Sequence, residues 1–267
     1  DRPDPVTEHR VSDQGVWSAS AGLTGEPHVV LVHGSLDRSA GLLKLSRRLD
    51  DRYLVTRYDR RGYGRSGPHP GPFDMEHQVA DLIDVIGQVP GAEGTVVIVG
   101  HSYGGNVALA VADRAPDLVA GVVTYESPLS WLDWWPNSGA GGSAMQSRAD
   151  PEQAAERFMR RLIGDDRWDK LPPSSRAARR SEGPAMIGEL TDLRLQAPWR
   201  PERIAAPVLA LHGEDGHEHH RRGTQALVDM LPTAHMHTVS GARHFGPNTH
   251  PDLVAGLVTE FSESLER

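Results

Sequence analysis

Short apolar runs recur along the chain, at intervals that leave room for a helix between them. They are apolar at nearly every position, as strands must be when helices cover both faces of a sheet. The runs are HVVLVH (28–33), YLVTRY (53–58), TVVIVG (95–100), LVAGVVTY (118–125), PVLALHG (207–213) and, as a weaker candidate, HMHTVSG (235–241). We predict that each run forms a strand of one buried sheet.

The segments between these runs combine apolar and polar residues at helical spacing. They predict helices over 39–51, 74–89, 102–115, 221–231 and 251–265. Strands that alternate with helices form βαβ units, so the pattern predicts an α/β fold with a doubly wound, mostly parallel sheet. Residues 9–20 are typical of a hairpin at the edge of that sheet.

The alternation breaks between Glu126 and Pro207, where no convincing strand occurs. Helical patterns cover 150–163 and 175–194, and the glycine-rich stretch 137–143 is typical of a flexible joint. Five of the six tryptophans lie here, and they either hold a small helical cap together or line an apolar pocket beneath it: Trp131, Trp134, Trp135, Trp168 and Trp199. We therefore expect a core of residues 1–126 and 204–267 with a helical cap inserted at 127–203.

Composition narrows the class of protein. The chain of 267 residues has no cysteine, which excludes a disulfide framework and a cysteine nucleophile and fits a reducing cytoplasm. It has no apolar run of about 18 residues that could cross a membrane. The net charge of −8 argues against nucleic acid as a partner. We expect a cytoplasmic protein that acts on a small molecule; the sequence does not indicate its oligomeric state.

The charge is unevenly distributed. Residues 148–203 hold 12 Arg and Lys against 10 Asp and Glu, a local net charge of +2, which leaves −8 − 2 = −10 for the remainder. Two interpretations are open. The segment is either an ordinary solvated helical surface or a mildly positive lid over an anionic substrate.

The segment VVIVGHSYGG (96–105) carries the strongest chemical signal. Gly100-His101-Ser102-Tyr103-Gly104 has the form G-x-S-x-G, directly after a predicted strand and directly before a predicted helix. A sharp strand-to-helix turn holds the serine hydroxyl exposed above the sheet, and small glycines permit the crowding around it. The N-terminus of the following helix would favour negative charge at the same place.

Four motifs in this order resemble the α/β-hydrolase family over nearly the whole chain. VLVHGS (30–35) is similar to its oxyanion loop, YDRRGYGRS (58–66) to the segment after its fourth strand, GHSYGG (100–105) to its nucleophile turn and GARHFGPNTHPD (241–252) to its histidine loop. The resemblance implies a mostly parallel eight-stranded sheet with a helical cap after the sixth strand. It also implies a catalytic triad in the chain order Ser, acid, His.

The resemblance assigns roles to particular residues. Ser102 would be the nucleophile and His244 the general base. The backbone N–H groups of Ser35 and Tyr103 would form the oxyanion hole. The substrate pocket would include Leu36, Trp131, Trp134 and Trp135.

The choice of His244 among 14 histidines rests on its setting. His244 alone has the Gly–small–x–His–Phe pattern after a predicted final strand. His33 and His101 lie in motifs that shape loops. The run HEHH (217–220) falls before a predicted helix and suggests a metal, but it lacks carboxylates at the spacing of a zinc peptidase. We therefore expect no metal and no cofactor.

The triad acid has two candidates. In the family it commonly follows the seventh strand, but the expected position here holds Gly216, with Asp215 one residue earlier. Some members place the acid at the end of the sixth strand, where this chain has Glu126. A side chain there opens into the crevice at the carboxyl ends of the strands. We predict that Glu126 is within hydrogen-bonding distance of His244 and keep Asp215 as the alternative.

These residues predict a serine hydrolase that cleaves a small, largely apolar ester, lactone or thioester through an acyl-enzyme. A serine nucleophile argues against the dehalogenase and epoxide hydrolase branches, which need a carboxylate there. Carbon–carbon bond hydrolases and perhydrolases use the same triad, so they remain alternatives. A small-molecule receptor on the same fold is an alternative of another class.

Overall fold

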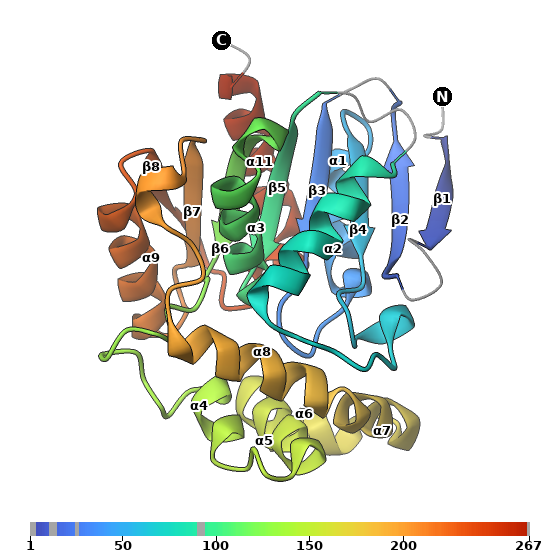
Figure 1. The fold of residues 1–267 in the computed structure, drawn as a ribbon, viewed down its shortest axis with the longest axis vertical. Helices are drawn as coiled ribbons and strands as arrows, with labels where there is room; N and C mark the ends of the chain where they lie inside the picture. Colours follow the sequence, from blue (N-terminus) through green and yellow to red (C-terminus); the bar gives the residue numbers. More distant parts are fainter. Residues whose placement is uncertain (1–3, 11–14, 25–26, 90–93, 266–267) are drawn as a thin grey trace.

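The computed structural model describes residues 4–10, 15–24, 27–89 and 94–265, and an eight-stranded sheet lies at its centre (Figure 1). The strand order is β1-β2-β4-β3-β5-β6-β7-β8, and neighbouring strands from β4 to β8 are parallel. The strands are β1 (Asp4–Arg10), β2 (Trp17–Gly22), β3 (His28–Val32), β4 (Leu54–Tyr58), β5 (Val96–His101), β6 (Val119–Tyr125), β7 (Val208–Gly213) and β8 (Ala234–Val239). The predicted α/β fold and eight-stranded sheet are therefore confirmed.

The predicted hairpin at the sheet edge is formed by β1 and β2, which pair antiparallel. It begins earlier than expected, at Asp4, and residues 11–14 within it lie outside the described residues. Strand β2 in turn pairs antiparallel with β4, so the two antiparallel strands form one edge of the sheet.

Helices cover both faces of the sheet (Figure 1). Alternate residues of a strand enter opposite layers: Val30 and Val32 pack with α2, α3 and α9, whereas Val29 and Leu31 pack with α1 and α11. These helices are α1 (Leu43–Leu49), α2 (Met75–Gly87), α3 (Tyr103–Arg114), α9 (Glu218–Met230) and α11 (Pro251–Leu265), and the short α10 (Gly246–Thr249) precedes the last. Within the described residues, none of the helices combines the length and apolar character that a membrane span needs.

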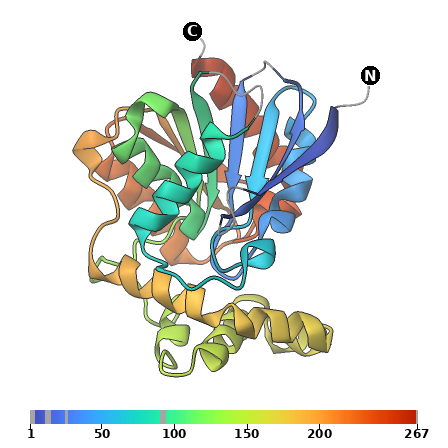
Figure 2. The same ribbon diagram turned by 45° about the vertical axis from the view of Figure 1, so that its right-hand side comes forward.

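The segment between β6 and β7 folds into a separate layer of helices beneath the sheet, called here the α4–α8 layer (Figures 1 and 2). Its helices are α4 (Ala140–Met145), α5 (Pro151–Ile163), α6 (Asp165–Lys170), α7 (Pro173–Ser181) and α8 (Gly183–Leu195). The helical pattern over 175–194, which Gly183 and Pro184 interrupt, forms two helices joined at Glu182.

The expected flexible joint at 137–143 was wrong in part, because its second half begins α4. Packing explains this helix: a Cβ on Gly142 would stand 2.2 Å from the carbonyl oxygen of Asn137, so only glycine permits the close approach.

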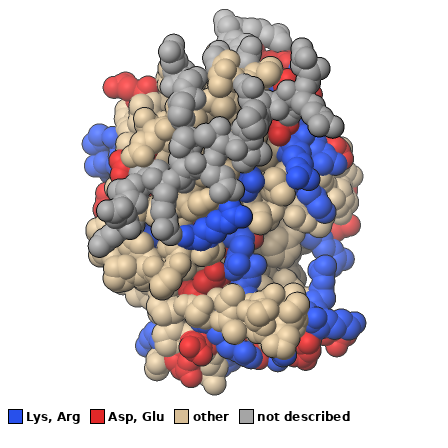
Figure 3. Space-filling model, turned by 90° about the vertical axis from the view of Figure 1, so that its right-hand side faces the viewer, with Lys and Arg blue, Asp and Glu red and all other residues tan. Residues whose placement is uncertain are grey.

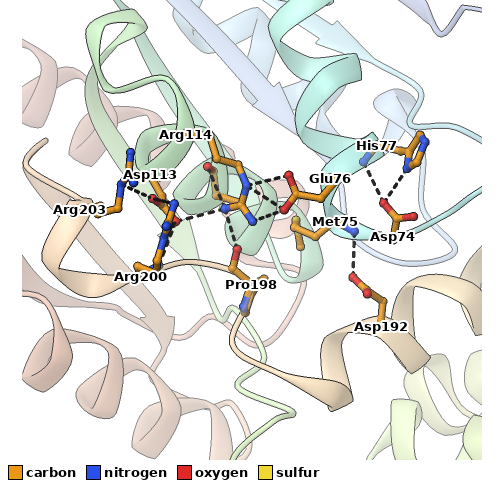
Figure 4. Close-up of polar contacts among 11 residues, drawn as sticks. Asp74, Met75, Glu76, His77, Asp113, Arg114, Asp192, Pro198, Arg200 and Arg203 are labelled. Atoms are coloured by element: carbon orange, nitrogen blue, oxygen red, sulfur yellow. Dashed lines mark hydrogen bonds and ion pairs between the residues drawn. The ribbon is translucent and has the colours of Figure 1, made fainter.

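Charged side chains fasten the end of this layer to the core (Figure 4). The buried carboxylate of Asp113, in α3, accepts a hydrogen bond of 3.0 Å from Arg200 and forms an ion pair of 3.2 Å with Arg203. Asp192 of α8 accepts a hydrogen bond of 2.8 Å from the backbone N–H of Met75, at the start of α2. The chain that leaves α8 is therefore held against the two helices that cover one face of the sheet.

A second junction lies on the side of the molecule that Figure 3 faces, where basic side chains gather between the sheet and the α4–α8 layer. A cavity of about 550 Å³ there is lined by Arg38, Arg65 and Glu182, among others. Arg38 pairs with Glu182 at 2.7 Å, and Arg65 stacks over the ring of Trp17. Charges of both signs thus meet across this junction.

Candidate active site

Ser102 occupies the turn between β5 and α3 in a strained backbone conformation. Its φ of 54° and ψ of −124° lie in a region that residues other than glycine rarely adopt. Its backbone N–H donates a hydrogen bond of 2.8 Å to the carbonyl of Tyr125, which fixes the turn against the neighbouring strand. The strain is therefore held in place by the sheet, as the G-x-S-x-G motif predicts.

The glycines around Ser102 are required by close backbone contacts. A Cβ on Gly100 would stand 2.4 Å from the carbonyl oxygen of Gly104, and a Cβ on Gly104 would stand 2.2 Å from that of Val32. A Cβ on Gly34 would stand 3.0 Å from the Cβ of Ser102. The loop after β3 thus lies directly against the serine.

Glu126 ends β6 with its side chain completely buried. One carboxylate oxygen accepts a hydrogen bond of 2.7 Å from Nδ1 of His244, and the other accepts one of 2.9 Å from the backbone N–H of Gly213. The structure therefore brings together the two residues that the sequence pairs as acid and base.

The ionisation of Glu126 follows from these contacts. Burial alone would raise the pKa of the carboxyl group. The hydrogen bond from His244, the charges of the His220 and His244 imidazoles and the N–H of Gly213 outweigh burial and lower the pKa to about 2. Glu126 is therefore an anion at neutral pH and acts only as an acceptor, so Nδ1 is the nitrogen that carries the proton in a neutral His244 imidazole, and Nε2 then keeps its lone pair.

Backbone strain is concentrated at this site. Within the described part of the chain, three residues other than glycine have positive φ angles: Leu36 (51°), Ser102 (54°) and Glu126 (49°). Each follows the carboxyl end of a strand, after β3, β5 and β6 respectively. Such conformations cost on the order of 1–3 kcal/mol each and cluster at functional sites, so their grouping marks this edge of the sheet as functional.

The alternative acid, Asp215, makes no hydrogen bond or ion pair with His244 among the contacts of the described residues. It is exposed, and its backbone N–H bonds to the carbonyl of Ala242. The family's usual acid position, Gly216, faces the same space from the other side: a Cβ there would stand 2.9 Å from Oε1 of Glu126. The Glu126 carboxylate thus occupies the space that a side chain at Gly216 would need.

Two other histidines shape the loops around the site. Nε2 of His101 donates a hydrogen bond of 2.7 Å to the backbone carbonyl of His244, and burial lowers the pKa of His101 to about 3. Nδ1 of His33 donates to the carbonyl of Gly34 at 2.7 Å, and its Nε2 accepts from the N–H of Arg60 at 2.9 Å. Both imidazoles are neutral and link neighbouring loops, as predicted.

The backbone N–H groups of Ser35 and Tyr103 are both available to donate a hydrogen bond to a ligand. Neither donates a hydrogen bond to another described residue outside regular helix and strand pairing. Tyr103 begins α3, so its N–H belongs to the unpaired first turn of that helix. Its side chain is buried beneath the guanidinium of Arg60, 4.7 Å from the ring centre, and so contributes no pocket wall.

A cavity of about 210 Å³ lies between the sheet and the α4–α8 layer, and Ser35, Ser102 and His244 all line it. No hydrogen bond joins the Ser102 hydroxyl to His244 among the described residues; such bonds often form only with substrate present. The apolar part of the wall comes from Pro128, Trp135, Pro136, Phe158, Leu162 and Leu190.

The expected pocket residues were wrong in three of four positions. Trp135 lines the cavity, but Leu36 is buried in a cluster with the α4–α8 layer. Trp131 packs edge-on against Trp199, and Trp134 lies under the guanidinium of Arg222. Trp131 and Trp134 therefore have the structural role that the sequence analysis gave as the alternative to lining a pocket.

His220 is a site residue that the sequence analysis missed. Its ring stacks on His244 at 4.7 Å between centroids and 20° between planes, and its Nε2 lies 3.7 Å from Glu126. The expectation that 217–220 precede a helix was wrong, because α9 begins at Glu218 and turns His219 and His220 toward the cavity. The helical spacing of its first turn was the available signal.

Glu126, His220 and His244 place three possible metal ligand atoms within 4.8 Å of one another. The donor set suits zinc, but the geometry does not. The rings of His220 and His244 stack nearly parallel, so their in-plane lone pairs run side by side instead of converging on one ion. A metal would also have to displace the proton that joins His244 to Glu126.

The family model for the alpha/beta hydrolase family matches residues 29–257, and the chain belongs to that family. A pimeloyl-[acyl-carrier protein] methyl ester esterase from Sodalis glossinidius is 30% identical over 90% of this chain and 95% of its own length.

Solved structures agree on the fold. A thermophilic esterase from Thermogutta terrifontis superposes with a TM-score of 0.74 over 98% of this chain and 100% of its own, at 20% identity. An alpha/beta hydrolase from Sphaerobacter thermophilus has a TM-score of 0.66 over 96% of this chain and 99% of its own, at 25% identity.

Proposed function

We propose that this chain is a serine hydrolase that cleaves small carboxylic esters through a covalent acyl-enzyme on Ser102. The observation that carries the proposal is the hydrogen bond of 2.7 Å from His244 to the buried carboxylate of Glu126, at a cavity that Ser102 also lines. The similarity to a named methyl ester esterase over nearly the whole chain supports ester hydrolysis as the reaction.

In the proposed reaction, Nε2 of His244 takes the proton of Ser102 as its oxygen attacks the ester carbonyl. The N–H groups of Ser35 and Tyr103 bind the oxyanion that forms, and His244 then gives the proton to the departing alcohol. A water molecule attacks the acyl group by the reverse sequence and releases the acid. Glu126 stays ionised throughout and stabilises the imidazolium.

The cavity supports a small substrate. Its volume of about 210 Å³ is below the range of roughly 300–1,000 Å³ that is common for ligand pockets. We further propose that the α4–α8 layer is a cap over the site, with the core formed by 1–126 and 204–267 and the cap by 127–203. The apolar wall residues of this cap suit an ester with an apolar body.

The experiment follows release of p-nitrophenol from p-nitrophenyl acetate in a stopped-flow instrument. We expect a rapid burst and turnover in the wild type and neither in Ser102→Ala, with a phosphonate probe labelling the wild type alone. Folding of the variant is checked by circular dichroism. Equal turnover in Ser102→Ala would overturn the proposal, and tight ligand binding without turnover on a panel of esters would favour a receptor instead.

A further inference from the structure

The cavity above Ser102 is lined by an arginine from the α4–α8 layer and by histidines from the opposite side, and by no carboxylate among the described residues. Among the described residues that line it, none is an aspartate or a glutamate, whereas Arg161 and four histidines do line it. Glu126, the carboxylate that lies close to His220 and His244, is already bound to His244 and Gly213. A ligand in this cavity therefore meets hydrogen-bond donors and a permanent positive charge.

Arg161 lies in the last turn of α5 and is only partly used by the protein. Its Nε donates a hydrogen bond of 3.0 Å to the backbone carbonyl of Ser138, which fixes the side chain against the cavity wall. No carboxylate of the described residues lies within ion-pair distance of this guanidinium. Its two terminal nitrogens, which carry four N–H donors, remain for a ligand.

A second guanidinium stands behind the same wall. Arg194, near the end of α8, is half-buried, and its Nη1 donates only to the carbonyl of Leu190 in its own helix at 2.9 Å. It too lacks a carboxylate partner among the described residues. Burial lowers the pKa of Arg194, which means that burial destabilises its charged form. A nearby anion would stabilise that form.

Gly141 lies between the cavity and this second charge, because Gly141 lines the cavity and Arg194 does not. Gly141 lines the cavity, and a Cβ there would stand 3.1 Å from Nη2 of Arg194. Any larger residue would cover the nitrogen. The segment 138–142 thus lies close to two guanidinium groups: Arg161, which lines the cavity and bonds to Ser138, and Arg194, which lies next to Gly141 behind the wall.

We propose that the substrate of this hydrolase is a small ester that carries a carboxylate, that Arg161 binds this carboxylate at the cap end of the cavity, and that Arg194 adds positive charge behind the wall. The substrate's two charged oxygens match the planar guanidinium fork, and its apolar body contacts Trp135, Phe158 and Leu190. The local net charge of +2 over 148–203, against −10 elsewhere, favours the same interpretation. The inference rests on the proposed function, because it places the ester group at Ser102.

The test measures binding without turnover. Monomethyl glutarate and its neutral diester, dimethyl glutarate, are titrated into Ser102→Ala by calorimetry. We expect the anion to bind at least about 10-fold more tightly than the diester, as a charge-assisted hydrogen bond implies. Arg161→Gln in the same background should weaken binding of the anion about 10-fold, Arg194→Gln should weaken it by a smaller factor, and both should leave the diester within about twofold.

Arg167→Gln is the matched control, because Arg167 is exposed in α6 and does not line the cavity. It removes the same charge and should leave both affinities unchanged. Equal affinity for the two esters, no binding of the anion, or an anion affinity that neither arginine variant changes would overturn the inference. The p-nitrophenyl acetate assay uses a neutral ester, so its result decides the proposed function separately.

Discussion

Two glutamates of this protein have completely buried side chains at the boundary between the sheet and the α4–α8 layer, yet their partners differ. Glu126 faces imidazoles: it accepts from His244 at 2.7 Å and has His220 at 3.7 Å. Glu189, in α8, faces a permanent cation and a phenol: it pairs with Arg60 at 2.6 Å and accepts from Tyr63 at 2.6 Å.

The different partners give the two glutamates different roles: one can serve a reaction, and the other stabilises the fold. An imidazole can gain and lose a proton near neutral pH, so a carboxylate beside it can serve a reaction. A guanidinium keeps its charge, so Glu189 neutralises Arg60 and ties the helical layer to the core. Arg60 in turn donates to the carbonyls of His33 and Gly34, just before Ser35. One glutamate thus orients the proposed base, and the other supports the loop that carries an oxyanion donor.

The largest effect is expected from Glu126→Gln. An amide can offer His244 the wrong hydrogen-bonding partner and select the wrong tautomer, so kcat for p-nitrophenyl acetate should fall about 10⁴-fold. Asp215→Asn is the control, because Asp215 is exposed and the partner of His244 is Glu126; its kcat should change by less than about twofold. A large loss in Asp215→Asn with little loss in Glu126→Gln would exchange the two assignments.

Glu189→Gln should instead reduce stability. It leaves the buried charge of Arg60 without its counter-ion, which typically costs about 3–5 kcal/mol. Urea unfolding followed by circular dichroism measures this loss, while kcat should stay within about tenfold. The matched surface change, Glu218→Gln, breaks an exposed ion pair with Arg221 and should leave the urea unfolding curve close to that of the wild type. If Glu189→Gln leaves stability intact and abolishes turnover, the contrast between the two glutamates is wrong.

The smallest expected effect is a loss of stability that occurs only at acidic pH. The pKa of Glu126 is about 2 in the folded protein, below the ordinary value of 4.5. Its contribution to stability is therefore fully present above about pH 4.5 and is lost as the pH falls toward 2. The difference of about 2.5 units corresponds to about 3 kcal/mol, more than half of it lost by about pH 3.

Urea unfolding of the wild type and of Glu126→Gln between pH 6 and pH 2.5 tests this expectation. The wild type should lose more stability than the variant over that interval, because the variant has no carboxyl group to titrate at this position. Parallel curves for the two proteins would mean that the fold does not stabilise the charge of Glu126.

Much of the fold could be predicted because its signals are local. Each apolar run became a strand of the sheet, and alternation with helices indicated parallel pairing. The helical layer was harder, because its short helices depend on packing: α4 uses glycines that are usually typical of a loop.

The candidate site divides in the same way. Ser102 and His244 lie in short motifs that can be recognised from neighbours in the chain, and Glu126 was predicted as an acid at a strand end. The pocket residues were mostly wrong, since Leu36, Trp131 and Trp134 turn into packed clusters. His220 was missed because its role depends on where α9 begins and on which way its first turn faces.

By itself, the sequence determined the order of strands and helices, the nucleophile turn and the two candidate acids, because periodicity and turn chemistry act over a few neighbouring residues. Only the tertiary structure shows which of these two acids is hydrogen-bonded to His244, namely Glu126. Glu126 and Gly216 lie far apart in the chain but face the same small volume, which a single carboxylate fills. The structure also decided which charges meet across the cavity, because contacts between distant segments arise only when the layers pack.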